Sequence, residues 1–159
     1  MSNLNYSLLK DYVIFTEIDP STMYYLQGWE GLGLAGEDVA TGSPYGTIYN
    51  PSDVLTYNTL STTFIIDEDW KTFDKITSLA LGNAPTNSED YYPNTTDIDL
   101  YVMNNTYKKP VGYFRMSGAY VQSIMNITQA YNTEDNTIVH TMTVIWRYQY
   151  HKFYRSSDE

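Results

Sequence analysis

The sequence contains no cysteine, and no apolar stretch in it approaches the ~20 residues that a membrane-spanning helix requires. Without cysteine the chain forms no disulfide, has no thiolate nucleophile and offers no cysteine-ligated zinc or iron–sulfur site. The first ten residues lack the basic start and the apolar core of a secretion signal. We therefore expect a soluble protein that is not exported by that route.

Histidine is also scarce, since the chain has only His140 and His151. They lie eleven positions apart on one predicted strand, and an odd separation places them on opposite sides of it. We expect His140 to be a hydrogen-bonded interior side chain. No Gly-x-Ser-x-Gly elbow, phosphate-binding Walker loop or two-histidine metal spacing occurs. The sequence therefore predicts a protein that is not an enzyme, with no catalytic residue, no cofactor and no metal site.

Two patterns are similar to ligand sites but have simpler explanations. The stretch Gly31–Gly36 matches the glycine spacing of dinucleotide-binding loops. That motif requires a strand turning into a helix, whereas more glycine and proline follow here, so we interpret the match as accidental. The carboxylates of Asp67–Asp69 precede a helical pattern and would cap it. Asp97 and Asp99 alternate onto the wet face of a predicted strand, so we predict no cation site.

The charge balance is strongly acidic, with a net charge of −10 at pH 7. Such a surface argues against a nucleic-acid binder, whose affinity comes from cations that neutralise phosphates. It favours either simple solubility or a surface that lets a polyanion pass without retaining it. The seventeen tyrosines suit sheets whose outer faces become subunit interfaces, although aromatic residues also favour strands in general.

Length and periodicity predict one domain over residues 1–159, because a chain of this size buries a sizeable core. The fold class is mainly β (α+β), an antiparallel β-sandwich or barrel with one flanking helix at about residues 69–81. On that helix Trp70, Phe73 and Ile76 recur at the spacing of a core face, and Gly82 ends it. The predicted strands are Tyr12–Ile18, Met23–Trp29, Val54–Ile66, Asp97–Met103, Val111–Met116, Ala119–Thr128 and Thr137–Phe153.

The segment at about residues 30–53 is rich in glycine and proline, and it is longer than most loops inside compact domains. We predict a long inter-strand loop there. Apolar residues in such a loop favour burial against another molecule, so we expect it to be poorly ordered in a free subunit and ordered against a neighbour. The predicted inter-subunit interface consists of Leu32, Leu34, Val39, Tyr45, Ile48 and Tyr49.

The string Leu55–Trp70, followed by Leu79–Gly82 at the end of the helix and by the four terminal strands, resembles the tail-tube proteins of contractile-tailed, T4-like bacteriophages and the related tube-initiator rings of the baseplate. The resemblance covers most of the chain. It implies a virion structural protein that forms a hexameric ring, in which strands of neighbouring subunits join into an inner barrel. Rings of this family stack into a tube through which DNA leaves the capsid.

The same resemblance implies the partners and the location. The partners would be further copies of the chain, the sheath and the baseplate hub, with DNA only in transit and no membrane. The protein would be assembled in the host cytoplasm and located in the tail of the virion. Asp97 and Asp99 are then candidate acidic residues of the lumen.

Two alternatives remain open at this point. The first is another small tail ring, such as a baseplate adaptor or a tail terminator. The second belongs to a different class, a small ligand-binding β-barrel with a lid at residues 30–53.

Overall fold

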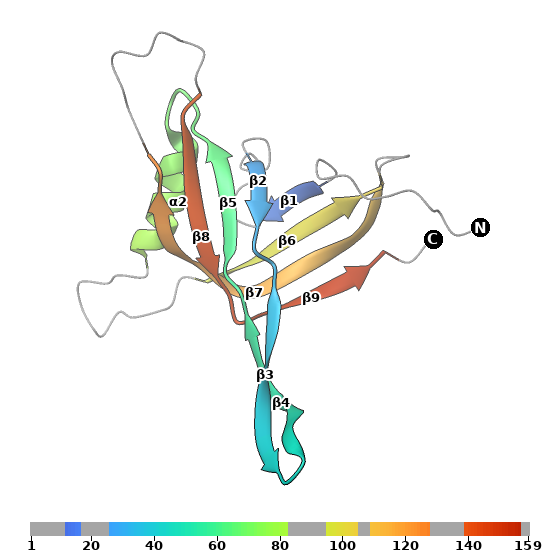
Figure 1. Cartoon of the computed structure of the whole chain (residues 1–159). Coiled ribbons are helices and arrows are strands. Elements are labelled where there is room, and N and C mark those ends of the chain that lie inside the picture. The colour runs from blue at the N-terminus through green and yellow to red at the C-terminus, as the bar shows by residue number, and fades with distance from the viewer. Residues whose placement is uncertain (1–11, 17–25, 83–94, 105–108, 128–138, 157–159) are drawn as a thin grey trace.

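Antiparallel strands make up most of the structure, a computed structural model that describes residues 12–16, 26–82, 95–104, 109–127 and 139–156 (Figure 1). The predicted class, mainly β with antiparallel sheets and one helix, is confirmed for these residues. The elements in chain order are β1 (Tyr12–Thr16), β2 (Leu26–Glu30), β3 (Leu34–Ser43), β4 (Gly46–Tyr57), β5 (Leu60–Ile65), α2 (Lys71–Leu81), β6 (Thr96–Met103), β7 (Pro110–Met125), β8 (Thr141–Arg147) and β9 (Tyr150–Arg155).

Seven of the strands form one curled sheet in the order β1-β6-β7-β8-β5-β2, with β9 also paired to β7. The long strand β7 joins the two halves of this sheet. Its first part pairs with β6 and β9, as in the register Arg115↔Lys152, and its last part pairs with β8, as in Met125↔Thr143. The two halves run at a wide angle to each other in Figure 1 and enclose the core as a half-barrel.

The pairing partner of β7 changes around Gly118, since Ser117 pairs with Tyr150 of β9 and Tyr120 pairs with Arg147 of β8. Gly118 has a φ of +65°, and its lack of a side chain leaves room for that of Gln149. The sequence predicted two separate strands here, Val111–Met116 and Ala119–Thr128, but β7 continues through Gly118 because glycine adopts this left-handed conformation without steric cost. The predicted long strand Thr137–Phe153 is instead divided into β8 and β9. The division falls at Tyr148 and Gln149, where the Gln149 N–H donates to the Ser117 carbonyl at 3.0 Å.

The core lies between the two halves of the sheet and is built by alternation along β5, β6 and β8. Residues pointing inward on these strands are buried, and their neighbours are half-buried or exposed, as the period of two requires. The buried hydrophobic residues are Leu60, Phe64, Ile66, Ile76, Ile98, Leu100, Met116, Ala119, Val121, Met142, Val144, Trp146 and Tyr148.

The helix begins two residues later than predicted and ends at the predicted place, before Gly82. The carboxylate of Asp67 accepts the N–H groups of Thr72 at 2.9 Å and Lys71 at 3.1 Å, so it caps the first turn as predicted. These hydrogen bonds, that from Thr72 above all, lower the pKa of Asp67. No helix in the described ranges is long and apolar enough to cross a membrane.

The predicted core face of the helix is confirmed, with unequal burial. Ile76 is fully buried, whereas Trp70 and Phe73 are partly buried at the margin of the core and pack edge-to-face with ring centroids 5.4 Å apart. Trp70 precedes the first turn in a left-handed conformation, with φ at 55°. The helix α2 packs against β7, beside the end of that strand and β8 in Figure 1, and it closes that side of the core.

The first two strands separate into different halves of the sheet. β1 pairs with β6, and β2 pairs with β5. The sequence predicted them as consecutive strands, Tyr12–Ile18 and Met23–Trp29, and they do not pair with each other. Residues 1–11 and the outer ends of the predicted strands at Ile18, Met23, Thr128 and Thr137 lie outside the described residues.

Candidate assembly surface

The segment predicted to be a loop at residues 30–53 is instead mostly a pair of strands. β3 and β4 form a two-stranded hairpin that projects from the body of the molecule (Figure 1). We call this hairpin, Leu34–Tyr57, the arm. Its register runs from Leu34↔Tyr57 to Ser43↔Gly46 with one bulge after Gly36. The sequence did not predict these strands because neither face of the arm is buried. Alternation of apolar and polar residues indicates a strand only when one of its faces is buried.

Two glycines form the neck through which the arm leaves the sheet. Gly31 has a φ of +102°, and a Cβ there would lie 2.4 Å from the carbonyl oxygen of Thr59. Gly33 faces the Asn58 side chain equally closely, and its carbonyl accepts the Asn58 N–H at 3.0 Å. β3 follows this stretch, not a helix, so the glycines serve a close chain crossing and the geometry of a dinucleotide loop is not formed.

The arm exposes its apolar side chains to solvent. Every residue from Leu34 to Tyr57 is exposed except Ser43, Ser52 and Tyr57 itself. The exposed large apolar residues are Leu34, Val39, Tyr45, Ile48, Tyr49, Val54 and Leu55. An isolated two-stranded hairpin is only marginally stable in water, so a second surface is needed to stabilise the arm.

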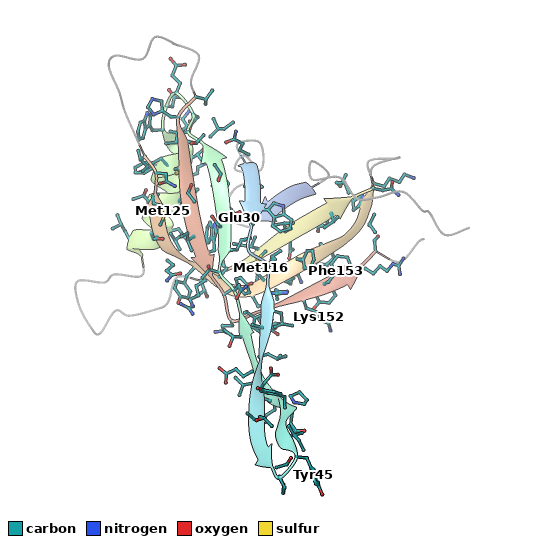
Figure 2. The ribbon with its side chains drawn as sticks, in the orientation of Figure 1. Glu30, Tyr45, Met116, Met125, Lys152 and Phe153 are labelled. Carbon is teal, nitrogen blue, oxygen red and sulfur yellow. The ribbon has the colours of Figure 1, made fainter. Side chains whose placement is uncertain are left out.

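Apolar side chains lie on both faces of the arm. Val39 and the adjacent Ala40 point to opposite faces, and they stand opposite Asn50 and Tyr49 respectively. Tyr45 is fully exposed at the tip (Figure 2). There the turn is held by the Ser43 hydroxyl, which donates to the Gly46 carbonyl at 2.8 Å. A partner covering one face alone would leave the other in water.

The structure brings together five of the six residues predicted for the interface. Leu32 is the exception, because it lies in the neck and packs against the core. Sequence reasoning missed Val54 and Leu55, which we assigned to the next strand; in the structure β4 ends at Tyr57 and β5 begins at Leu60. The arm also carries three acids, Glu37, Asp38 and Asp53, and no lysine or arginine.

The two predicted lumen acids share the outer face of β6, opposite the buried Ile98 and Leu100. Asp99 accepts two hydrogen bonds from the Nε and Nη2 groups of Arg115, both at 2.8 Å. This pair raises the pKa of the Arg115 guanidinium. Asp97 accepts the N–H of Gly118 at 3.2 Å. The negative charge of Asp99 is therefore balanced by a neighbouring strand.

A row of three tyrosines crosses the same outer face. Tyr101, Tyr113 and Tyr154 occupy matched positions on β6, β7 and β9, and successive ring centroids are 5.2 Å apart. Cations cover two of the rings, Arg115 over Tyr113 at 5.5 Å and Lys152 over Tyr154 at 5.3 Å. The sequence shows the abundance of tyrosine but not this row, because the row exists only once the register of three strands is fixed.

The two histidines occupy different environments. His140 is exposed, so the prediction of an interior imidazole was wrong; its backbone carbonyl accepts the Ile66 N–H at 2.8 Å. His151 is half-buried beside Tyr57 at the base of the arm, with ring centroids 5.0 Å apart, and its Nδ1 lies 3.2 Å from the Tyr148 hydroxyl. Burial lowers the pKa of His151. In the described part of the chain, no group of three histidine or acidic residues is arranged to hold a metal ion.

Comparison with known proteins places the fold. No protein-family model matches the chain, and no curated protein matches its sequence. Among solved structures, the tube-terminating cap of the anti-feeding prophage aligns over 98% of this chain and 95% of its own, at 8% identity and a TM-score of 0.75.

Two chains of the extracellular contractile injection system PVC are also similar. One, from the sheath–tube complex in the extended state, covers 95% of this chain and 93% of its own, at 9% identity and a TM-score of 0.69. The other, from the sheath/tube terminator, covers 96% and 99%, at 11% identity and a TM-score of 0.68. The resemblance seen in the sequence is thus confirmed in the structure, and the chain has the fold of the tube and tube-terminating proteins of contractile injection systems.

Proposed function

We propose that this chain is a structural subunit that assembles with copies of itself into a hexameric ring of a bacteriophage tail tube or of its baseplate initiator. The observation that carries this proposal is the arm, whose apolar side chains are exposed on both faces in a single copy. A neighbouring subunit supplies the second surface that the arm requires. The likeness of the fold to tube and tube-terminating proteins supports the same assignment.

The energetics favour assembly of many copies over a single weak contact. Burial of apolar surface contributes roughly 25 cal/mol per Å2, so covering a few of the arm's large side chains contributes several kcal/mol. Fixing the rotamers of those side chains offsets part of this gain. In a closed ring the contact is repeated at every subunit, and each subunit is held from two sides.

The face that carries Asp97 and Asp99 is proposed to line the channel. Four charged residues of this face, Asp97, Asp99, Arg115 and Lys152, sum to zero. A polyanion passing over such a face meets no excess of cations that would retain it. This supports a tube that conducts DNA during ejection without binding it. Further partners on this proposal are the sheath and the baseplate hub, and the location is the tail of the virion.

A second candidate within the same class is a ring that ends the tube. Two of the similar structures are named as a tube-terminating cap and a sheath/tube terminator. The alternative of a ligand-binding barrel with a lid loses its main support, because the arm extends away from the sheet and does not close over it (Figure 1).

The test is removal of the arm without disturbing the neck. Replacing Glu37–Val54 by Asn-Gly closes the hairpin with a two-residue turn between the paired Gly36 and Leu55. We expect rings in negative-stain electron microscopy for the wild type, with six subunits in averaged images. For the shortened chain, in which two residues replace eighteen, we expect a folded monomer in light scattering, with a mass below the 18.3 kDa of the full chain.

A matched pair of variants separates the apolar side chains from the length of the arm. V39S/I48S/Y49S keeps the full length and is expected to remain monomeric, whereas T41S/T47S changes the same strands and is expected to assemble. Rings formed equally well by the shortened chain would show that the arm is not the assembly element.

A further inference from the structure

The charges of the chain are unevenly distributed between the arm and the opposite part of the molecule. The arm carries three acids and no base. The described lysines and arginines outside the helix lie just before β7, on its first part, at the end of β8, or on β9. They are Lys109, Arg115, Arg147, Lys152 and Arg155.

The strand β9 is an edge of the sheet, since among the described strands it pairs only with β7. Large apolar side chains are exposed along it, namely Tyr150, Phe153 and Tyr154, and Val111 is exposed on β7 beside its end. The Ser156 N–H donates to the Val111 carbonyl at 2.8 Å and holds this end together. We call Val111 and Tyr150–Arg155 the β9 edge. An edge with exposed apolar side chains is a template for pairing with another strand.

Cations at the β9 edge exceed the anions beside it. On the outer face the charges of Asp97 and Asp99 balance those of Arg115 and Lys152, so Arg155, on the other face of β9, is the excess cation. Arg155 stands opposite Gly112 and has no carboxylate partner within the described ranges. The β9 edge therefore combines unpaired strand backbone, apolar side chains and a net positive charge.

We propose that the arm of one copy docks on the β9 edge of the next copy, with Glu37 and Asp38 facing Lys152 and Arg155. This inference rests on the proposed function and adds to it the surface that receives the arm. The contact joins two different surfaces, so it repeats from copy to copy and closes into a ring when the rotation permits. The arm does not dock on the β9 edge of its own copy, because its tip at Tyr45 projects away from Lys152 and Phe153 (Figure 2).

Charge selects the β9 edge over the other exposed apolar group. That group consists of Met125, Ile127 and Val139, at the far ends of β7 and β8. The described stretches around it, residues 119–127 and 139–146, contain no lysine or arginine. An acidic arm gains no electrostatic attraction there, whereas at the β9 edge opposite charges would steer the encounter and fix the register.

Reversed charges on each surface test this pairing. E37K/D38K makes the arm basic, and K152E/R155E makes the β9 edge acidic. Each variant alone places like charges in every contact, so we expect at least a tenfold weaker assembly in light scattering and no rings. Mixed in equal amounts, the two variants alternate around the ring with opposite charges in each contact, and we expect rings to return with a 1:1 composition. Recovery on mixing also shows that both variants are folded.

The control is K71E/K75E on α2, an equal change of net charge on a different element, which is expected to assemble like the wild type. If either charge-reversed variant forms rings alone, or if their mixture stays monomeric, the pairing of the arm with the β9 edge is overturned. The proposed function as a ring subunit would still stand. A wild type that remains monomeric would overturn the proposed function and this inference with it.

Discussion

The indole N–H of Trp146 donates a hydrogen bond to the hydroxyl of Thr62 at 2.9 Å, between adjacent strands in the fully buried core. The same hydroxyl donates to the carbonyl of Val144 at 3.2 Å. A single threonine thus satisfies one buried donor and one backbone acceptor. Buried polar groups without such partners are costly.

Replacing this threonine tests the hydrogen bonds directly. T62V keeps the shape of the side chain and leaves the indole N–H without an acceptor, so we expect the free energy of unfolding to fall by about 1–3 kcal/mol. T62S retains the hydroxyl and is expected to lose less. Chemical denaturation measures both, and an unchanged midpoint for T62V would show that the hydroxyl is not required.

The loss of stability on truncating a side chain of the helix should increase with the burial of that side chain. I76A removes a fully buried side chain, so we expect a loss of about 2–5 kcal/mol in the free energy of unfolding. W70A and F73A remove side chains at the margin of the core, and we expect smaller losses than full burial would give. Thermal denaturation in which F73A is more damaging than I76A would contradict this order.

A side chain should be tolerated at Gly36 in the arm but not at Gly31 in the neck. G31A introduces a Cβ 2.4 Å from the Thr59 carbonyl oxygen at a φ of +102°, so we expect it to lower the thermal midpoint and displace the arm. In the matched control G36A, the new Cβ lies 3.6 Å from Leu55 Cδ2, an ordinary contact. G36A is therefore expected to be neutral, and equal effects of the two variants would refute the close crossing.

Stability should depend on pH through His151. Burial lowers its pKa below the ordinary value of 6.5, so the unfolded chain takes up the proton first as the pH falls. The free energy of unfolding is then constant well above pH 6.5 and decreases as the pH drops through that value. H151F keeps an aromatic ring without the titration and should remove this slope, whereas H140Q should keep it. Denaturation curves between pH 8 and pH 5 measure the difference.

The cap at Asp67 should act at lower pH. Hydrogen bonds from the helix lower its pKa below 3.8, so the stabilisation is present above that value and is lost as the pH falls through the lower folded value. D67N keeps an oxygen acceptor but cannot titrate, and it should show a shallower loss of helicity between pH 5 and pH 2 in circular dichroism. Parallel curves for the two proteins would exclude the cap as the titrating group.

Periodic and local features were determined by the sequence. The end of the helix at Gly82, its cap at Asp67 and the inward alternation of β5, β6 and β8 followed from spacing and composition, because burial of one face imposes a period on the residues themselves. The same reasoning found five of the apolar residues that the arm exposes. That inference needed only the observation that these apolar side chains lie in a glycine-rich segment, where nearby residues in the sequence offer little to bury them.

The tertiary structure alone decided whatever depends on register between distant residues. The pairing of β1 with β6, the tyrosine row, the Asp99–Arg115 ion pair and the β9 edge all join positions far apart in the chain. The division between β8 and β9 lies beside Gly118 in the sheet, where the Gln149 N–H donates to the Ser117 carbonyl. A residue's type and its near neighbours carry no information about which strand will lie beside it, because strand pairing is decided by the packing of the whole core.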